Sequence, residues 1–145
     1  MGDTSIKKWV SLGCGLLIIT LVGCGVQVST QGYTDALTKW SSSLTTLGND
    51  FQASDAFTTA GADRIVKEYQ TSLSELKAIK PPVELAPAHA AFVAVMGTGT
   101  GIMDSFKQAV SDGNRAKFDQ VKTQFTQWFT ALKAAGSLIG LKIGS

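Results

Sequence analysis

The chain has few of the residues that build disulfides, metal sites and nucleophilic active sites. Its 145 residues include two cysteines, Cys14 and Cys24, and one histidine, His89. A zinc site needs several cysteine or histidine ligands, and a disulfide needs a pair of free thiols. Both cysteines lie in the first 24 residues. The fold is therefore expected to depend on burial of apolar side chains, with no metal and no other cofactor.

Charge is also sparse and balanced. The sequence has 13 Lys and Arg against 11 Asp and Glu, a formal net charge of +2. Domains that bind nucleic acid carry a clustered basic surplus, which is absent from this sequence. Nucleic acid is therefore not an expected partner.

His89 is the residue to question for catalysis. A catalytic base needs a nucleophile or an acid within reach, and the sequence has no GxSxG motif and no second histidine. The Glu-x-x-His pairs of a di-iron bundle are also missing. An enzyme using His89 with Glu84 or Asp104 is the alternative. We interpret the protein as a non-enzyme and His89 as a residue of a helical bundle or a contact for a ligand or partner.

The N-terminal segment has the parts of an export signal. Lys7 and Lys8 precede an apolar run of 14 residues, Trp9–Val22. A helix that crosses a bilayer needs about 20 apolar residues, whereas the apolar part of a signal peptide has roughly 7–15. The length of the run therefore favours a signal peptide.

Leu21, Val22, Gly23 and Cys24 follow directly and resemble the lipobox of bacterial lipoproteins at every position. In that family a diacylglycerol is attached to the cysteine thiol, and the peptide is cut before the cysteine. The resemblance implies that residues 1–23 are a signal peptide, that Cys24 carries the lipid, and that the protein is anchored in the cell membrane or outer membrane, facing outside the cytoplasm. An uncleaved N-terminal membrane anchor is the alternative.

Residues 24–32 follow the lipobox and are small and polar without helical periodicity. We expect them to form a flexible tether between the lipid and a domain at residues 33–145.

Four segments of that domain have apolar residues at intervals of three and four, which is the pattern of a helix with one buried face. Helices are predicted at 33–51, 59–80, about 83–111 and, after the turn Asp112–Asn114, up to about Gly136, with Asp112 as a cap. The first helix was expected to fray near Gly48. The expected buried face of this helix consists of Tyr33, Leu37, Trp40, Leu44, Leu47 and Phe51. Four such helices joined by short turns predict an all-α antiparallel four-helix bundle.

Leu73–Met96 supports the same fold class. A leucine-containing helix ends at Pro81-Pro82 and is followed by a helix with an early histidine. This order resembles a pattern in secreted helical proteins of bacteria. The resemblance implies a helical bundle and no particular activity.

Gly97, Gly99 and Gly101 interrupt the third apolar stripe. Each glycine costs roughly 0.5–1 kcal/mol relative to alanine in a helix. We expect a kink or split in the helix, or the close approach of a neighbouring backbone. A pocket for a small apolar ligand near these glycines, between Met96 and Trp128, is a second functional hypothesis.

The sequence thus predicts a lipid-anchored cell-envelope protein with a non-catalytic bundle in a binding or scaffolding role. Its expected partners are the membrane, through Cys24, and an envelope protein or small ligand. Trp128 and Phe129 are adjacent, so both cannot point fully inward, and Phe129 joins His89 and the three glycines as a candidate contact.

Overall fold

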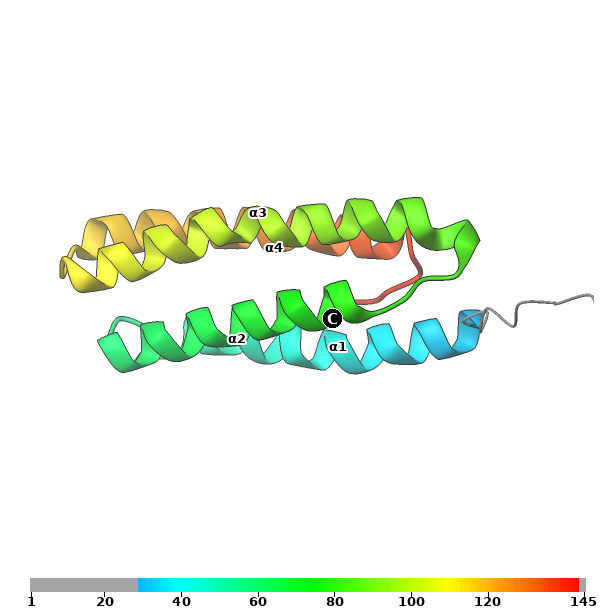
Figure 1. Cartoon of the computed structure of the whole chain (residues 1–145). Helices are drawn as coiled ribbons and strands as arrows, with labels where there is room; N and C mark the ends of the chain where they lie inside the picture. Colours follow the sequence, from blue (N-terminus) through cyan, green and yellow to red (C-terminus); the bar gives the residue numbers. More distant parts are fainter. Residues whose placement is uncertain (1–28, 144–145) are drawn as a thin grey trace, which may run out of the picture.

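The computed structural model describes residues 29–143, which form an all-helical unit (Figure 1). The all-α prediction is confirmed for this part of the chain. Cys24 and the three residues before it lie outside the described residues. The elements are α1 (Thr30–Gln52), α2 (Thr59–Ala78), the 3-10 turn η1 (Val83–Leu85), α3 (Ala86–Ser111) and α4 (Arg115–Ser137).

Side-chain caps set the starts of three helices. Ser29, Thr58 and Asn114 each accept a hydrogen bond from the backbone N–H three residues later. Such a bond satisfies one of the donors left free in the first turn of a helix. The Ser29 cap corrects the tether prediction, because residues 30–32 form the first turn of α1. Likewise Asn114, and not Asp112, caps α4.

Two predicted helix ends are also corrected. α1 continues past Gly48 to Gln52, because Phe51 is fully buried and its ring stacks on that of Phe125 at 4.0 Å between centroids. α2 ends at Ala78 and not at Lys80. Ile79 is already extended, with φ −69° and ψ 122°, ahead of the two prolines that cannot supply helical amide donors.

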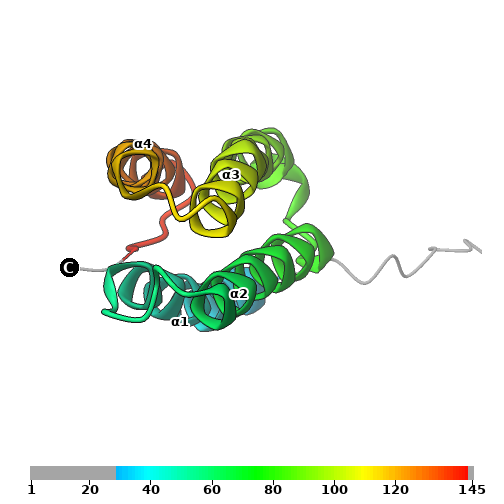
Figure 2. The ribbon, with the colours of Figure 1, turned by 90° about the vertical axis from the view of Figure 1, so that its left-hand side faces the viewer.

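The four helices pack against one another, and each lies beside the next along the chain. Contacts between helix ends fix their directions. The Tyr33 hydroxyl near the start of α1 lies 2.9 Å from Nδ1 of His89 near the start of α3. At the other end Phe51 packs against Phe106, with ring centroids 4.7 Å apart. Figure 2 shows α3 and α4 as one layer over α1 and α2.

The predicted apolar stripes form the core. All six expected positions of α1 are buried, as are Phe92, Met96, Met103 and Phe106 of α3. Leu73 of α2 is half-buried, whereas the neighbouring Ser72 is buried. Ser72 lies inside because its carbonyl oxygen accepts a hydrogen bond of 2.7 Å from the Trp40 indole of α1. A polar contact between α1 and α2 thus accompanies the burial of Ser72 in place of the predicted Leu73.

α3 remains helical through its glycine run, so the predicted split is wrong. A Cβ at Gly99 would lie 2.8 Å from two ring atoms of Trp128 and 2.9 Å from one of Tyr69, whereas Gly97 and Gly101 have nothing within 4 Å. Gly99 therefore marks a close approach, but by aromatic side chains of α2 and α4 and not by a backbone. This packing offsets the low helix propensity of glycine.

The segment after α4 folds back onto the core and does not extend the helix. Ile139, Leu141 and Ile143 are buried, and Gly140 between them has φ +74°. Gly136 makes room for this segment, because a Cβ there would lie 2.9 Å from the Ile143 side chain. The chain end thus contributes apolar side chains that close the core.

Among the described residues one helical segment, Val83–Ser111, has the length and apolar composition of a membrane span. Its large side chains Phe92, Met96, Met103 and Phe106 are buried in the core. Length and composition do not distinguish a membrane span from a helix of a bundle, and 22% of its most apolar window is buried.

The glycine run yields a matched test of packing. Gly99→Ala is expected to lower the free energy of unfolding by about 1–3 kcal/mol, because the added methyl overpacks the Trp128 and Tyr69 rings. Gly101→Ala, at an exposed and open helical position, is expected to raise it by about 0.5–1 kcal/mol. Denaturant unfolding of both variants measures the difference. A stabilised Gly99→Ala protein would contradict the described packing.

Candidate functional site

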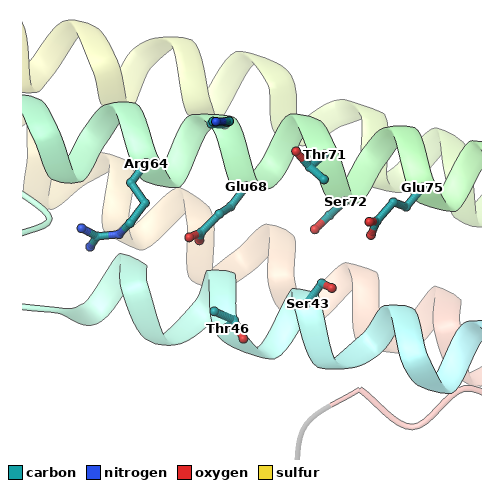
Figure 3. Close-up of a pocket in the computed structure, with 8 residues that line it drawn as sticks. Ser43, Thr46, Arg64, Glu68, Thr71, Ser72 and Glu75 are labelled. Atoms are coloured by element: carbon teal, nitrogen blue, oxygen red, sulfur yellow. The ribbon is translucent and has the colours of Figure 1, made fainter.

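A polar groove of about 420 Å³ lies between α1 and α2 (Figure 3). In Figure 3, Arg64, Glu68 and Glu75 reach from α2 toward α1. The groove is lined by Ser43, Thr46, Arg64, Lys67, Glu68, Thr71, Ser72 and Glu75.

The groove exists because polar residues flank the apolar stripes with the same helical spacing. Ser43 and Thr46 are three residues apart on α1, and Glu68 and Ser72 are four apart on α2, so each pair shares one face. The side chains from α1 are short, whereas those from α2 include long charged groups. The interhelical surface is consequently hollowed outside the core and lined by hydroxyls and charges of both signs.

Glu68 is the most unusual group in the groove. Its Oε2 atom is buried and is the one such side-chain atom among residues 29–143 that lacks a hydrogen-bond donor. The neighbouring carboxyl is that of Asp50, and two carboxyls form a hydrogen bond when one of them holds a proton. Burial raises the pKa of Glu68, Asp50 raises it further, and the positive charge of Arg64 opposes this rise.

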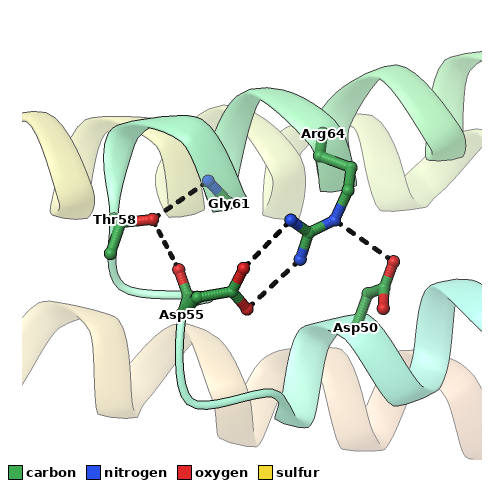
Figure 4. A network of polar contacts seen from close by, with 5 residues as sticks. All are labelled: Asp50, Asp55, Thr58, Gly61 and Arg64. Carbon is green, nitrogen blue, oxygen red and sulfur yellow. Dashed lines mark hydrogen bonds and ion pairs between the residues drawn. The ribbon is translucent and has the colours of Figure 1, made fainter.

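Arg64 ties one end of the groove to the α1–α2 turn (Figure 4). Its guanidinium donates two hydrogen bonds to the Asp55 carboxylate, at 3.0 and 3.2 Å, and one to Asp50 at 3.4 Å. The Arg64 hydrogen bond lowers the pKa of Asp55. A bidentate pair of this kind fixes geometry as well as charge.

The turn itself is held by Thr58 and Gly61. The Thr58 hydroxyl donates to the Asp55 carbonyl oxygen at 2.7 Å and accepts from the Gly61 N–H at 3.0 Å. A Cβ at position 61 would collide with the Asp55 carbonyl. The carboxylate that receives Arg64 is therefore presented by a tightly packed turn.

His89 is buried among the helix ends, with 6% of its surface exposed. Its Nδ1 is hydrogen-bonded to the Tyr33 hydroxyl at 2.9 Å, and burial lowers the pKa of its imidazole. Asp104 is 15 residues further along α3, which at 1.5 Å per residue is about 22 Å away. The structure does not bring these two predicted groups together, and the partners of the histidine are the Tyr33 hydroxyl and the Leu76 backbone.

Tyr69 and Trp128 occupy the space over Gly99, where a ligand pocket was predicted. Met96 and Met103 are buried at 0% and 1% exposure. The Trp128 indole donates to the Val95 carbonyl oxygen at 3.0 Å, which holds the ring in place. The hollow beside Gly101 lies on the outside, between α3 and α4. The interior at the glycine run is therefore filled by protein side chains.

Phe129 is half-buried and lines a second groove of about 420 Å³ between α1 and α4. Its ring lies 5.9 Å from that of Phe125, centroid to centroid, and the Lys133 ammonium is 5.3 Å from its centroid. Asn49 and Gln52 of α1 line the opposite wall. The prediction that Phe129 is partly accessible agrees with this position, and its role as a contact stays a prediction.

Metal binding has no visible support within residues 29–143, where no group of three or more His, Cys, Asp or Glu side chains is placed to hold an ion. What the α1–α2 groove offers chemically is hydrogen bonding and charge pairing with a polar partner. The groove is not among the predicted sites, because Glu68 and Glu75 lie outside the apolar stripe of their helix and the stripe was the basis of the prediction. The available signal was Ser72, a small polar residue at helical spacing from Glu68 and beside the apolar stripe.

Glu68 gives a prediction for the pH dependence of stability. Because its pKa is raised from 4.5 in the folded protein, the folded state binds more protons than the unfolded state just above pH 4.5. The contribution of Glu68 to the free energy of unfolding therefore falls as the pH rises through that window. Glu68→Gln is expected to raise the free energy of unfolding at pH 7 by on the order of 1 kcal/mol, since the amide can donate to Asp50.

Glu75→Gln is the matched control, because Glu75 is exposed in the same groove. Denaturant unfolding at pH 4 and pH 7 compares the two variants. Equal effects of both substitutions at pH 7 would contradict a special environment for Glu68.

His89 gives a second, independent titration. The folded imidazole is expected to titrate below its ordinary pKa of 6.5, because burial disfavours the charged form. The unfolded chain then binds a proton first, so this group lowers stability as the pH falls below 6.5. His89 is the single histidine of the chain, and NMR titration of its ring protons gives the value directly. A midpoint at or above 6.5 would refute the buried assignment.

No family model, no curated protein and no solved structure matches the chain.

Proposed function

We propose that the protein is a lipoprotein of a bacterial cell envelope, whose helical unit binds or scaffolds another envelope component without catalysis. The observation that carries the proposal is the sequence Leu21-Val22-Gly23-Cys24 after the apolar run and the Lys7-Lys8 pair. In this proposal residues 1–23 are removed and Cys24 carries the lipid. The described unit then lies outside the cytoplasm, held at the cell membrane or outer membrane.

The physical role of the lipid follows from the number of acyl chains. Each buried methylene contributes about 0.8 kcal/mol, and a single chain holds a protein only marginally. A diacylglycerol supplies two chains and makes a stable anchor. The helical unit therefore does not need a membrane span of its own.

The described fold supports a binding role. Its core is built from apolar side chains, and its hollows lie between neighbouring helices at the surface, where polar side chains line most of each wall. Tyr33 contacts His89 near the starts of α1 and α3, and Phe51 contacts Phe106 toward their other ends. These two helices therefore run in the same direction, which supports an antiparallel four-helix bundle, where alternate helices are parallel. His89 is committed to Tyr33 inside this bundle, which disfavours the alternative of an enzyme that uses it.

We place the binding surface in the groove between α1 and α2. Glu68 presents a partly buried carboxylate there, and Arg64 is held in place by Asp55. Hydroxyls and charges of both signs favour a polar partner, such as an envelope protein, over an apolar small molecule.

Intact-mass spectrometry of the protein extracted from membranes tests the anchor. The wild-type protein is expected to have the mass of a chain that begins at Cys24 plus acyl groups. Cys24→Ala is expected to lose the acyl mass and the cleavage, because the thiol is the attachment site. Cys14→Ala is the matched control and leaves the mature mass unchanged, since Cys14 is removed with residues 1–23.

A wild-type mass corresponding to an unmodified chain from Met1 would overturn the proposal. That result would favour the alternative of an uncleaved N-terminal anchor.

A further inference from the structure

Two large hydrophobic side chains are exposed in residues 29–143, Val83 at 82% and Leu138 at 75%. Val83 begins η1 in the connection between α2 and α3, and Leu138 follows the last residue of α4. The other apolar side chains of the segment after α4 are buried. These two side chains therefore stand apart from the packing that accounts for the rest of the apolar residues.

Both residues lie at the same end of the bundle. In Figure 1 the α2–α3 connection and the end of α4 lie toward the end of the bundle where α1 and α3 start, whereas α2 itself stops before that end. Contacts agree with this view, because Tyr33 of α1 is bonded to His89 of α3, and Gly136 of α4 lies beside Phe92 of α3. We call this the anchor-side end, defined by Val83, Leu138 and Lys80.

The opposite end has a different surface. Its two turns expose small and polar residues, including Ser54, Asp55, Asp112 and Asn114. The aromatic side chain in the first of these turns, Phe57, is half-buried and packs on Phe118. Exposed large apolar side chains are thus confined to one end of the described unit.

The length of the preceding chain ties this end to the proposed lipid. Cys24 is five residues before Ser29, the cap of α1. A chain advances at most about 3.6 Å per residue, so five residues reach about 18 Å. A lipid on Cys24 would therefore hold the start of α1, and with it the anchor-side end, within that distance of the bilayer.

One exposed lysine lies in the connection that carries Val83. Lys80 is exposed between α2 and α3, and Glu84 beside Val83 and Asp35 near the start of α1 are exposed acidic groups toward this end. Long lysine side chains can reach lipid phosphates while the apolar side chains beside them enter the headgroup region.

We propose that the anchor-side end docks on the surface of the lipid bilayer, with Val83 and Leu138 among the headgroups and Lys80 on a lipid phosphate. The inference rests on the proposed function, because the lipid on Cys24 brings this end to the membrane. Docking orients the bundle with its long axis away from the bilayer, so that the α1–α2 groove faces the envelope space along its length.

Lipid-borne quenching tests this orientation. The full chain is extracted from membranes and placed in vesicles of equal parts phosphatidylcholine and phosphatidylglycerol that contain a lipid with a headgroup nitroxide. Val83→Cys, Leu138→Cys and, as a far-end control, Ser54→Cys are each labelled with a fluorophore. All three positions are exposed, so circular dichroism is expected to show an unchanged helical fold.

Quenching is expected to be severalfold stronger at positions 83 and 138 than at position 54. Equal quenching at the three positions, in a protein shown to be lipidated, would overturn the docking and leave the anchor intact. Labelling of the chain without an introduced cysteine separates the docking proposal from the lipoprotein proposal. A lipidated Cys24 takes up no label, whereas labelling of the parent chain would show a free thiol and overturn the lipoprotein proposal together with the docking that rests on it.

Discussion

The contact of Trp128 and Tyr69 with Gly99 is the interaction on which much of the structure depends. It joins α2 and α4 to the centre of α3, and a methyl group in place of the glycine hydrogen would not fit. The polar ends of both rings are satisfied on α3, where Trp128 donates to Val95 and Tyr69 to Met96. With no disulfide expected in the helical unit, close packing of this kind has to hold the layers together.

The same packing explains how function is divided over the molecule. The described interior is filled with side chains at the glycine run, so the binding role that we propose falls to the grooves and ends of the bundle. Glu68 shows the energetic consequence at the α1–α2 groove. Its carboxyl is partly withdrawn from water next to Asp50, whereas His89 is withdrawn from water at the anchor-side end. Their titrations affect stability in opposite directions, which makes the two environments separable by pH.

The sequence predicts the apolar faces well because burial on one side of a helix leaves a direct periodic record. All six expected positions of α1 are inside, from Tyr33 to Phe51. It predicts less well what depends on partners distant in sequence. The environment of Glu68 depends on Asp50 of α1, which is 18 residues earlier in the chain. The Ser29 cap is instead a local signal, three residues from its donor Gly32, and the tether prediction overlooked it. Intrinsic propensity likewise favoured a break at Gly99, which rings from two other helices prevent.

The ends of the bundle connect the fold to the proposed location. The start of α1, the α2–α3 connection and the end of α4 lie toward one end of the described unit (Figure 1). The proposed lipid, joined to the chain just before α1, would therefore bring three separate parts of the sequence close to the membrane. Val83 and Leu138 have no role in the core, and exposure of such side chains to water is unfavourable. In the proposed docking, a bilayer at this end would supply the apolar contact that the rest of the fold leaves missing, and the polar grooves on the sides would remain free for the proposed partner.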